Sequence, residues 1–256
     1  GVQTCALPIL MFVLLLLPTV ALALSVDRRI VGGSDVDIAD FPWQGSYRTG
    51  TGSHSCGCVF VGGQYVLTAG HCGGSSAYSM EFGSTNRGSG TVVSVTSVLI
   101  HPNYGQGPGF TPNDISVVTA ASAISGPNIS PGTIAGNANN PGGNGYITGW
   151  GRTCGSCALP VTLQGVETPI ISDSECANLH GTSFQADNMI CVYNAASQNT
   201  GACNGDSGGP LSVGSTIYGL TSWGRSGCLT TFPSVYNRVG AFNSWVCANS
   251  NGVSGC

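Results

Sequence analysis

Short apolar runs separated by turn residues dominate the pattern of hydrophobic and polar positions along the chain. Helical periodicity is confined to two short stretches, Ser172–Leu179, with Ser172 or Asp173 as its N-cap, and Val239–Cys247. Runs rich in β-branched or aromatic residues and bounded by Gly, Pro, Asn or Ser predict strands, for example Gln64–Thr68, Thr91–Ile100, Ile115–Thr119 and Ser215–Ser222. The pattern therefore predicts an all-β fold, either a sandwich or a pair of barrels.

The N-terminal part of the chain has a different pattern. Residues 11–23 form an apolar run that ends in Ala21-Leu22-Ala23, the small-residue pattern at which signal peptides are cut. This run is too short to span a bilayer. Residues 1–10 precede it without an initiator methionine, and we interpret them as an upstream or non-native segment. We expect a signal peptide at residues 11–23 and a secreted, extracellular product with no membrane anchor.

A dibasic pair, Arg28-Arg29, ends the short segment 24–29 and directly precedes Ile30-Val31-Gly32-Gly33. Its position between a cleaved leader and a glycine-rich start favours an activation peptide over a chance occurrence. A cut after Arg29 would release a new amino group on Ile30. Residues 30–256 would then form the mature catalytic unit.

Length and composition narrow the classes of protein to which the chain can belong. The 256 residues are enough for one all-β unit, and a hydrophobic content of 41% argues against disorder. The chain has no lysine and its seven arginines are scattered, so there is no basic patch to bind nucleic acid. Twelve cysteines behind an apolar leader indicate an oxidising compartment in which most of them form disulfides.

A candidate nucleophile stands in Gly205-Asp206-Ser207-Gly208-Gly209, which fits the pattern G-x-S-x-G. That pattern also occurs in α/β-hydrolases, which need their catalytic histidine after the serine. All four histidines of this chain precede Ser207, and alternating helices are not predicted. The α/β-hydrolase interpretation is therefore excluded.

A serine hydroxyl needs a neutral imidazole as base and a carboxylate that orients the imidazole. His71 follows an apolar strand and precedes Cys72, which can anchor the turn, so it is the best candidate base. Asp114 immediately precedes a strand expected to be buried, where a carboxylate needs a partner. Asp173 and Asp187 lie in polar, turn-like stretches and are expected to be cap or surface residues. We predict a triad of His71, Asp114 and Ser207.

Five spaced motifs over residues 30–247 resemble those of the trypsin/chymotrypsin family: Ile30–Gly33, Thr68–Cys72, Asn113–Ile115, Gly205–Pro210 and Ser222–Gly224. The resemblance implies two packed six-stranded antiparallel β-barrels with a short C-terminal helix. It places His71 and Asp114 in the first barrel and Ser207 in the second. It also implies that the N–H groups of Gly205 and Ser207 form an oxyanion hole and that Asp206 pairs with the Ile30 ammonium after activation. In the precursor, Asp206 would bond His54 and Ser46 instead, although a merely structural His54 is an equal alternative.

The resemblance also implies three disulfides, Cys56–Cys72, Cys176–Cys191 and Cys203–Cys228. It gives no partner for Cys58, Cys247 or Cys256. Cys154-Gly155-Ser156-Cys157 has the spacing of a redox or zinc motif, but without a second matching pair we favour a loop disulfide. No metal or cofactor is implied, and residues 84–90, where some relatives bind calcium, lack the carboxylates that Ca²⁺ prefers.

Substrate preference follows from the implied pocket, which contains no charged residue. Without a carboxylate there, a buried substrate Lys or Arg would be unpaired, so we expect cleavage after large uncharged residues such as Phe, Tyr, Leu or Met. An elastase-like preference for small aliphatic residues is the alternative. The pocket positions implied by the resemblance are Gly201, Ser222, Trp223, Gly224 and Ser234.

The expected partners are protein or peptide substrates, an activating trypsin-like protease and protein protease inhibitors, and the protein is expected to be a monomer. The competing hypothesis from another functional class is a catalytically inactive relative that binds a partner. Such relatives have usually replaced a triad residue, whereas all three are present here.

Overall fold

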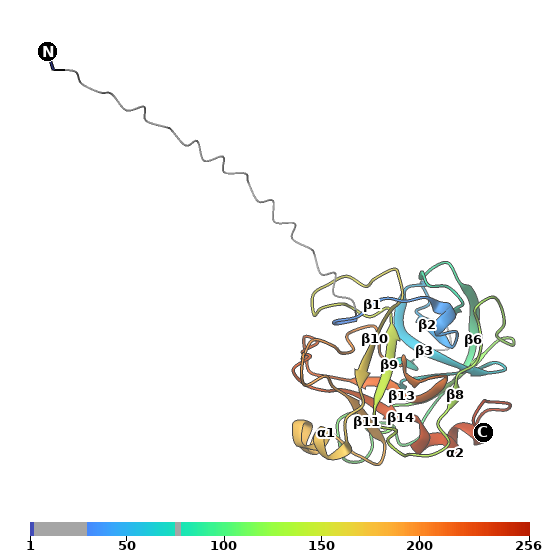
Figure 1. Ribbon diagram of the computed structural model, residues 1–256. Coiled ribbons are helices and arrows are strands. Elements are labelled where there is room, and N and C mark those ends of the chain that lie inside the picture. The colour runs from blue at the N-terminus through green and yellow to red at the C-terminus, as the bar shows by residue number, and fades with distance from the viewer. Residues whose placement is uncertain (3–29, 75–77) are drawn as a thin grey trace.

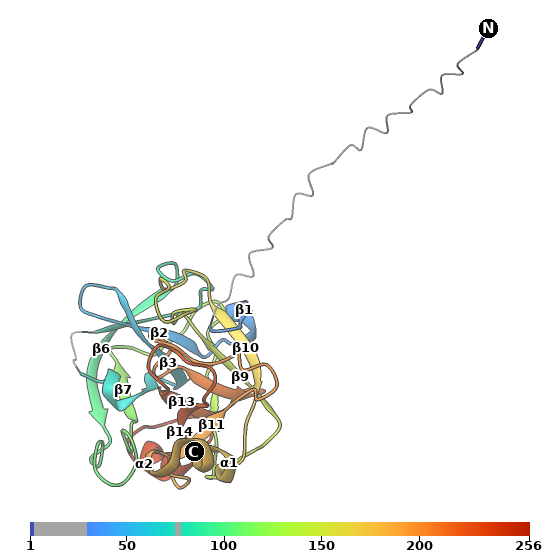
Figure 2. The same cartoon turned by 90° about the vertical axis from the view of Figure 1, so that its left-hand side faces the viewer.

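The computed structural model of the chain describes residues 1–2, 30–74 and 78–256. The expected signal peptide, the expected activation peptide with Arg29, and residues 3–10 lie outside the described residues. Figures 1 and 2 show two β-structures packed side by side, with α1 and α2 at one end of the molecule.

The first β-structure is a closed antiparallel barrel with the strand order β2-β3-β4-β7-β6-β5. Its strands β3, β4 and β7 carry consecutive apolar residues and are buried on both sides. Phe60, Val66 and Val118 pack in one cluster, whereas Val59, Leu67 and Val117 pack in another. Its bounds are β2 Gln44–Arg48, β3 His54–Gly62, β4 Tyr65–Thr68, β5 Ser79–Phe82, β6 Thr91–Ile100 and β7 Ser116–Ala120.

The second β-structure is an eight-stranded sheet with the order β1-β10-β9-β12-β13-β14-β11, and β8 pairs with β13. An isolated bridge between Ile170 and Val192 joins the end of β10 to the end of β11 and brings the outer strands together. The bounds are β1 Ser34–Asp35, β8 Thr133–Ile134, β9 Asn144–Gly149, β10 Gln164–Pro169, β11 Met189–Val192, β12 Pro210–Val213, β13 Thr216–Trp223 and β14 Ser234–Arg238.

Both predicted helical stretches are helical. In α1, Asp173–His180, the Ser172 side chain accepts a hydrogen bond from the Glu175 N–H and is therefore the N-cap. The C-terminal stretch begins with a 3-10 turn, Val239–Phe242, and continues as α2, Asn243–Ala248. Three further 3-10 turns lie at Ile38–Asp40, Gly70–Cys72 and Gly181–Ser183. Among the described residues, no helix has the length and apolar character needed to cross a membrane.

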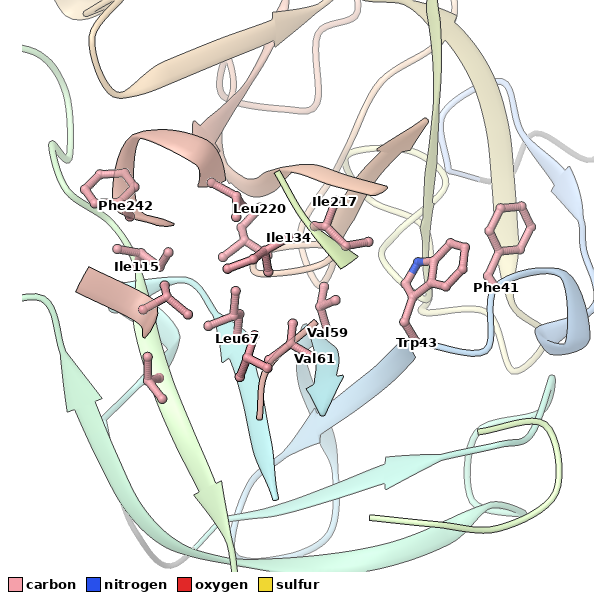
Figure 3. Packing of buried hydrophobic residues seen from close by; sticks show 14 residues of the cluster. Phe41, Trp43, Val59, Val61, Leu67, Ile115, Ile134, Ile217, Leu220 and Phe242 are labelled. Atoms are coloured by element: carbon pink, nitrogen blue, oxygen red, sulfur yellow. The ribbon is translucent and has the colours of Figure 1, made fainter. Parts of the chain in front are cut away.

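The largest apolar cluster lies between the two β-structures (Figure 3). Val59 and Leu67 of the first barrel meet Ile217 and Leu220 of β13, and Val246 of α2 closes one side. Burying these side chains fixes one β-structure against the other, because apolar packing is dense and resists sliding. The predicted all-β, two-barrel fold is confirmed. The second unit adds β1 and β8 to the six strands β9–β14.

Candidate active site

His71 and Asp114 come together from two segments of the first barrel. His71 lies in the 3-10 turn Gly70–Cys72 after β4, and Asp114 lies two residues before β7. The His71 Nδ1 atom is 2.7 Å from Asp114 Oδ2, and the His71 backbone N–H donates to Asp114 Oδ1 at 2.8 Å. The Asp114 side chain is fully buried, whereas the His71 side chain is 32% exposed. The Nδ1 edge of the imidazole is thus held by a buried carboxylate, while the rest of the ring remains partly accessible.

Two residues of the second β-structure hold Asp114 in place. The Ser222 hydroxyl donates to Asp114 Oδ2 at 2.6 Å. The Asn237 side chain accepts from the Asp114 N–H at 3.1 Å and donates to the Asp114 carbonyl. The Ser222 bond helps to satisfy a buried charge that would otherwise be costly, and the Asn237 bonds fix the Asp114 backbone. The sequence analysis placed Ser222 in the pocket only and missed Asn237, for which no motif gives a signal.

Ser207 lies in a tight turn before β12 and is fastened to the first barrel. Its carbonyl accepts a hydrogen bond from the Gly57 N–H of β3 at 2.8 Å. The next residue, Gly208, has φ 77°, and a Cβ atom there would lie 2.1 Å from Thr68 Oγ1. Only glycine allows this close approach of the turn to β4.

The serine hydroxyl and the imidazole are on adjoining elements but are not hydrogen-bonded to each other. Within the described part of the chain, no hydrogen bond joins Ser207 Oγ to His71. Catalytic hydrogen bonds are often long in free enzymes and shorten when substrate binds. The arrangement is therefore compatible with proton transfer from Ser207 to His71.

Two backbone N–H groups in the Ser207 turn have no acceptor within the described part of the chain. The Asp206 N–H donates to Cys203 O at 3.0 Å and the Gly208 N–H donates to Thr221 O at 2.7 Å. Among the residues that the structure describes, the N–H groups of Gly205 and Ser207 make no such bond. Gly205 has φ 101°, and a Cβ atom there would be 2.9 Å from Leu159 Cδ2. This turn conformation leaves a pair of donors available to a developing oxyanion.

Asp206 is 2% exposed and points away from the pair of free donors. Its carboxylate accepts from the Gly151 N–H at 2.8 Å and from the Cys203 N–H at 2.9 Å. Burial raises the pKa of Asp206 to about 7, although these two N–H donors act in the opposite direction. Glycines make room for it, since a Cβ atom at Gly149 or Gly151 would lie within 2.3 Å of the carboxylate.

Ile30 is 1% exposed and packs in an apolar cluster with Ile147 and Tyr236. The following residue, Val31, pairs with Gly201, whose N–H donates to the Val31 carbonyl at 3.1 Å. The segment after Arg29 is therefore in direct contact with a residue assigned to the substrate pocket.

The expected bond from His54 to Asp206 is not formed in this arrangement. The His54 Nδ1 atom is 2.7 Å from Ser46 Oγ, and its Nε2 atom is 2.9 Å from the Gly205 carbonyl. Burial lowers the pKa of His54 to about 4, so the ring is neutral at physiological pH. His54 supports the backbone of Gly205.

A pocket of about 250 Å³ opens next to Ser207. Ser222, Trp223 and Gly224, three of the pocket positions implied by the resemblance, are among its lining residues. Gly201 and Ser234 are buried behind this lining, where Ser234 Oγ accepts from the Ala202 N–H at 3.0 Å. No carboxylate is among the described residues that line the pocket. Asn204 and Thr221 also line it and were not predicted from the sequence.

Five disulfides join described cysteines. Three are the pairs implied by the resemblance, and they brace the His71 turn, α1 and the pocket. The other two are Cys154–Cys157, a loop disulfide, and Cys247–Cys256, a pair that the resemblance does not imply. Cys58 on β3 is a free, buried thiol.

Two groups of side chains have metal-ligand atoms close together or lie beside the residues where some relatives bind calcium, but both are already engaged. The sulfurs of Cys56 and Cys72 and a ring nitrogen of His71 lie within 4.8 Å of one another, but both sulfurs belong to a disulfide and lack the thiolate that binds metal. Beside residues 84–90, Glu81 Oε1 accepts from the N–H groups of Gly88 and Gly90, each at 2.7 Å, and its Oε2 is 3.3 Å from Arg48. The Glu81 carboxylate is thus already engaged by the protein.

Comparisons with known proteins agree with this geometry. A fibrinolytic enzyme, isozyme C, of Lumbricus rubellus is 38% identical over 243 residues, which cover 86% of this chain and 100% of that protein. A chymotrypsin-like serine proteinase of Haliotis rufescens is 36% identical, over 86% of this chain and 91% of that protein. Trypsin alpha of Drosophila melanogaster is 38% identical, over 89% of this chain and 90% of that protein.

A solved structure of neuropsin, a serine protease expressed in the limbic system of mouse brain, superposes with a TM-score of 0.77 at 29% identity. The superposition covers 85% of this chain and 98% of neuropsin. The family profile named Trypsin matches residues 30–246. The chain therefore belongs to the trypsin family and is a serine endopeptidase.

Proposed function

We propose that the protein hydrolyses peptide bonds through an acyl-enzyme formed on Ser207. The observation that carries this proposal is the buried Asp114 carboxylate bound to His71 Nδ1 beside the Ser207 turn. Asp114 fixes the tautomer in which His71 Nε2 is free to accept a proton. His71 then takes the proton from Ser207 Oγ as it attacks the carbonyl carbon and delivers it to the leaving amine. Water enters in the second half of the cycle and releases the acyl group by the same route.

The N–H groups of Gly205 and Ser207 are proposed to stabilise the tetrahedral intermediate. Both are without a protein acceptor in the described residues and belong to the same turn as the nucleophile. Such donors are fixed before the reaction, so they need no reorganisation when negative charge develops on the substrate oxygen. The nearby His54 bond to the Gly205 carbonyl supports this turn.

We propose a preference for large uncharged residues on the acyl side of the cleaved bond. The pocket beside Ser207 has no carboxylate among its described lining residues, and Gly224 leaves one wall without a side chain. A buried guanidinium or ammonium group would find no counter-charge there. Preference for small aliphatic residues is the alternative, because the volume of about 250 Å³ accommodates either.

The protein is further proposed to be a secreted zymogen that a trypsin-like protease activates by cutting after Arg29. The pairing of Val31 with Gly201 supports this, because it connects the start of the mature segment to the pocket. The freed Ile30 ammonium would pair with Asp206, whose buried carboxylate has no cationic partner among the described residues. Secretion is supported by the five disulfides and the apolar segment 11–23.

Reaction with a serine phosphonylating reagent tests the proposed nucleophile. The activated protein is expected to incorporate one phosphonyl group at Ser207 and to lose peptidase activity. The Ser207→Ala variant is expected to fold normally, to incorporate none, and to be inactive. Activity of Ser207→Ala within tenfold of the unmodified enzyme would contradict the assignment. A folded, activated protein that neither reacts nor cleaves peptides would support the inactive binding relative.

A further inference from the structure

A second pocket, distinct in its lining from the one beside Ser207, has a volume of about 500 Å³. Its walls combine three aromatic side chains, Phe41, Trp43 and Tyr146, with two carboxylates, Asp40 and Glu167. Figure 3 shows Phe41 and Trp43 side by side at the outer edge of the central apolar cluster. This pocket, called the aromatic-acidic pocket below, has no part in the proposed reaction.

Strand register places the Glu167 carboxylate beside an aromatic ring. Tyr146 of β9 lies directly opposite Glu167 of β10 and directly opposite Ser212 of β12. Residues directly opposed in antiparallel strands project from the same face, with Cβ atoms about 4.5–5.5 Å apart. Glu167 therefore stands over the same face of the sheet as the Tyr146 ring.

The segment before β2 supplies the other wall. The Phe41 ring lies 5.1 Å from the Tyr146 ring at an interplanar angle of 39°, and 6.2 Å from the Trp43 ring at 89°. Asp40 directly precedes Phe41, so its carboxylate stands at the edge of this ring cluster. Phe41 and Trp43 are buried and back the wall rigidly, and the partly buried Tyr146 is the ring that the wall presents to a ligand.

The two carboxylates have no partner among the residues that the structure describes. Asp40 and Glu167 are both exposed, and no hydrogen bond or ion pair joins either side chain to another described residue. By contrast, the buried Glu81 is engaged by Arg48 and two N–H groups. Two unpaired carboxylates flanking a rigid aromatic wall attract a cation with an apolar body, because the ring faces and the carboxylates both carry negative potential.

We propose that the aromatic-acidic pocket binds the guanidinium group of an arginine side chain presented by a protein or peptide partner. A guanidinium group stacks on aromatic faces and bonds carboxylates through its planar donors, whereas a small inorganic cation gains nothing from the rings. The chain has a formal net charge of −4 and no lysine, so its overall field favours the approach of a basic segment.

Binding is tested with the full-length Ser207→Ala protein, which does not cut the probe. The probe is the peptide acetyl-Gly-Arg-Gly-amide, and the matched probe replaces arginine with citrulline, which keeps the shape and removes the charge. Isothermal titration is expected to show at least about tenfold tighter binding of the arginine peptide, weakened by added salt. Free arginine is a separate arm, and binding tighter than that of the peptide would assign the site to a small metabolite and overturn the proposal.

Charge-neutral variants locate the binding. Asp40→Asn and Glu167→Gln are each expected to weaken binding of the arginine peptide about threefold or more, and together about tenfold or more. Tyr146→Leu should also weaken it. The control Glu175→Gln makes the same chemical change on α1, outside the pocket, and should leave affinity within about twofold. Unchanged affinity in the double variant overturns the proposal.

A peptidase assay distinguishes binding in the aromatic-acidic pocket from binding in the pocket beside Ser207. In the activated enzyme, hydrolysis of a small uncharged substrate is expected to continue at its normal rate when the arginine peptide is saturating. Competitive inhibition that persists in the Asp40→Asn, Glu167→Gln enzyme would place the arginine beside Ser207 and overturn the proposal. Equal binding of the citrulline peptide would do the same.

Discussion

Gly208 is a residue at which the Ser207 turn closely approaches the first barrel. A methyl group there would meet Thr68 Oγ1 at 2.1 Å and also strain a backbone at φ 77°. Gly208→Ala is expected to lower the free energy of unfolding by about 2–4 kcal/mol and to abolish turnover, because the clash displaces Ser207. Urea unfolding and a peptidase assay measure the two effects.

Gly252→Ala is the matched control for this substitution. Gly252 has φ 71°, but an added Cβ atom there has nothing within 4 Å. Its replacement should cost only the backbone strain of about 1–2 kcal/mol and leave turnover intact. Equal losses in the two variants would show that the contact with Thr68 is unimportant.

Asp206 gives the uncut protein a specific dependence of stability on pH. Burial raises the pKa of Asp206 from 3.8 to about 7, so the folded precursor binds more protons than the unfolded chain between these values. The stabilising contribution is present at low pH and is lost as pH rises towards the folded pKa. The thermal midpoint of Asp206→Asn is therefore expected to fall less than that of the precursor between pH 4 and pH 7.

Activation should change the same pH dependence. Once the Ile30 ammonium is free, its charge lowers the pKa of Asp206 and favours the carboxylate. The cut enzyme should then lose less stability than the precursor over this pH range. Calorimetry of both forms makes the comparison, and identical slopes in the precursor, its Asp206→Asn variant and the cut enzyme would contradict the role of Asp206.

Candidate catalytic residues could be predicted from the sequence where they lie within a local motif. His71 and Asp114 were chosen for their positions at strand ends, and the structure brings their side chains together at 2.7 Å. Ser222 and Asn237 are 108 and 123 positions from Asp114, and their contacts with it depend on how the two β-structures pack. Such tertiary contacts leave no local pattern.

The bounds of individual strands could also be predicted from local sequence, whereas contacts between distant strands could not. The run Thr91–Ile100 is β6 with the predicted bounds, and Ser215–Ser222 is displaced by one residue in β13. Val239–Cys247 was predicted as one helix but begins as a 3-10 turn, a common tightening at helix ends. The single bridge between Ile170 and Val192 is a tertiary contact that periodicity cannot reveal.

The Cys247–Cys256 disulfide ties the C-terminal segment to α2. It spans a sequence separation of 9, and Val253 within the loop packs into the central cluster. Replacing both cysteines by serine is expected to lower the free energy of unfolding by about 2–3 kcal/mol by releasing the unfolded chain. Neither cysteine lines the pocket beside Ser207, so kcat/KM of the folded enzyme should be unchanged.

Replacement of Cys203 and Cys228 by serine is the contrasting variant. Both cysteines line the pocket beside Ser207, so kcat/KM should fall together with stability. Thermal unfolding and a peptidase assay on both double variants measure the difference. A large loss of kcat/KM in the Cys247, Cys256 variant would show that α2 acts on the active site.

At the scale of the whole molecule, the arginine at the proposed activation site does not suit the protein's own proposed substrate pocket. The cut lies after Arg29, whereas the described lining of the pocket offers an arginine no carboxylate. Purified precursor is therefore expected to remain latent on long incubation and to gain activity when a trace of trypsin-like protease is added. Electrophoresis and N-terminal sequencing for Ile30 follow the cut. Processing by the pure precursor that Ser207→Ala prevents would show that the pocket accepts arginine.

The buried Cys58 has a consequence for the durability of the whole enzyme. Among the described cysteines it is the one free thiol, it is fully buried, and burial raises the pKa of Cys58. Exchange between disulfides requires attack by an accessible thiolate. This thiol is protonated and enclosed in the first barrel. Among the described residues, the folded catalytic unit therefore has no thiolate of its own that could start thiol–disulfide exchange. Where external thiols are scarce, its five bridges should therefore keep their pairing for as long as the barrel stays closed.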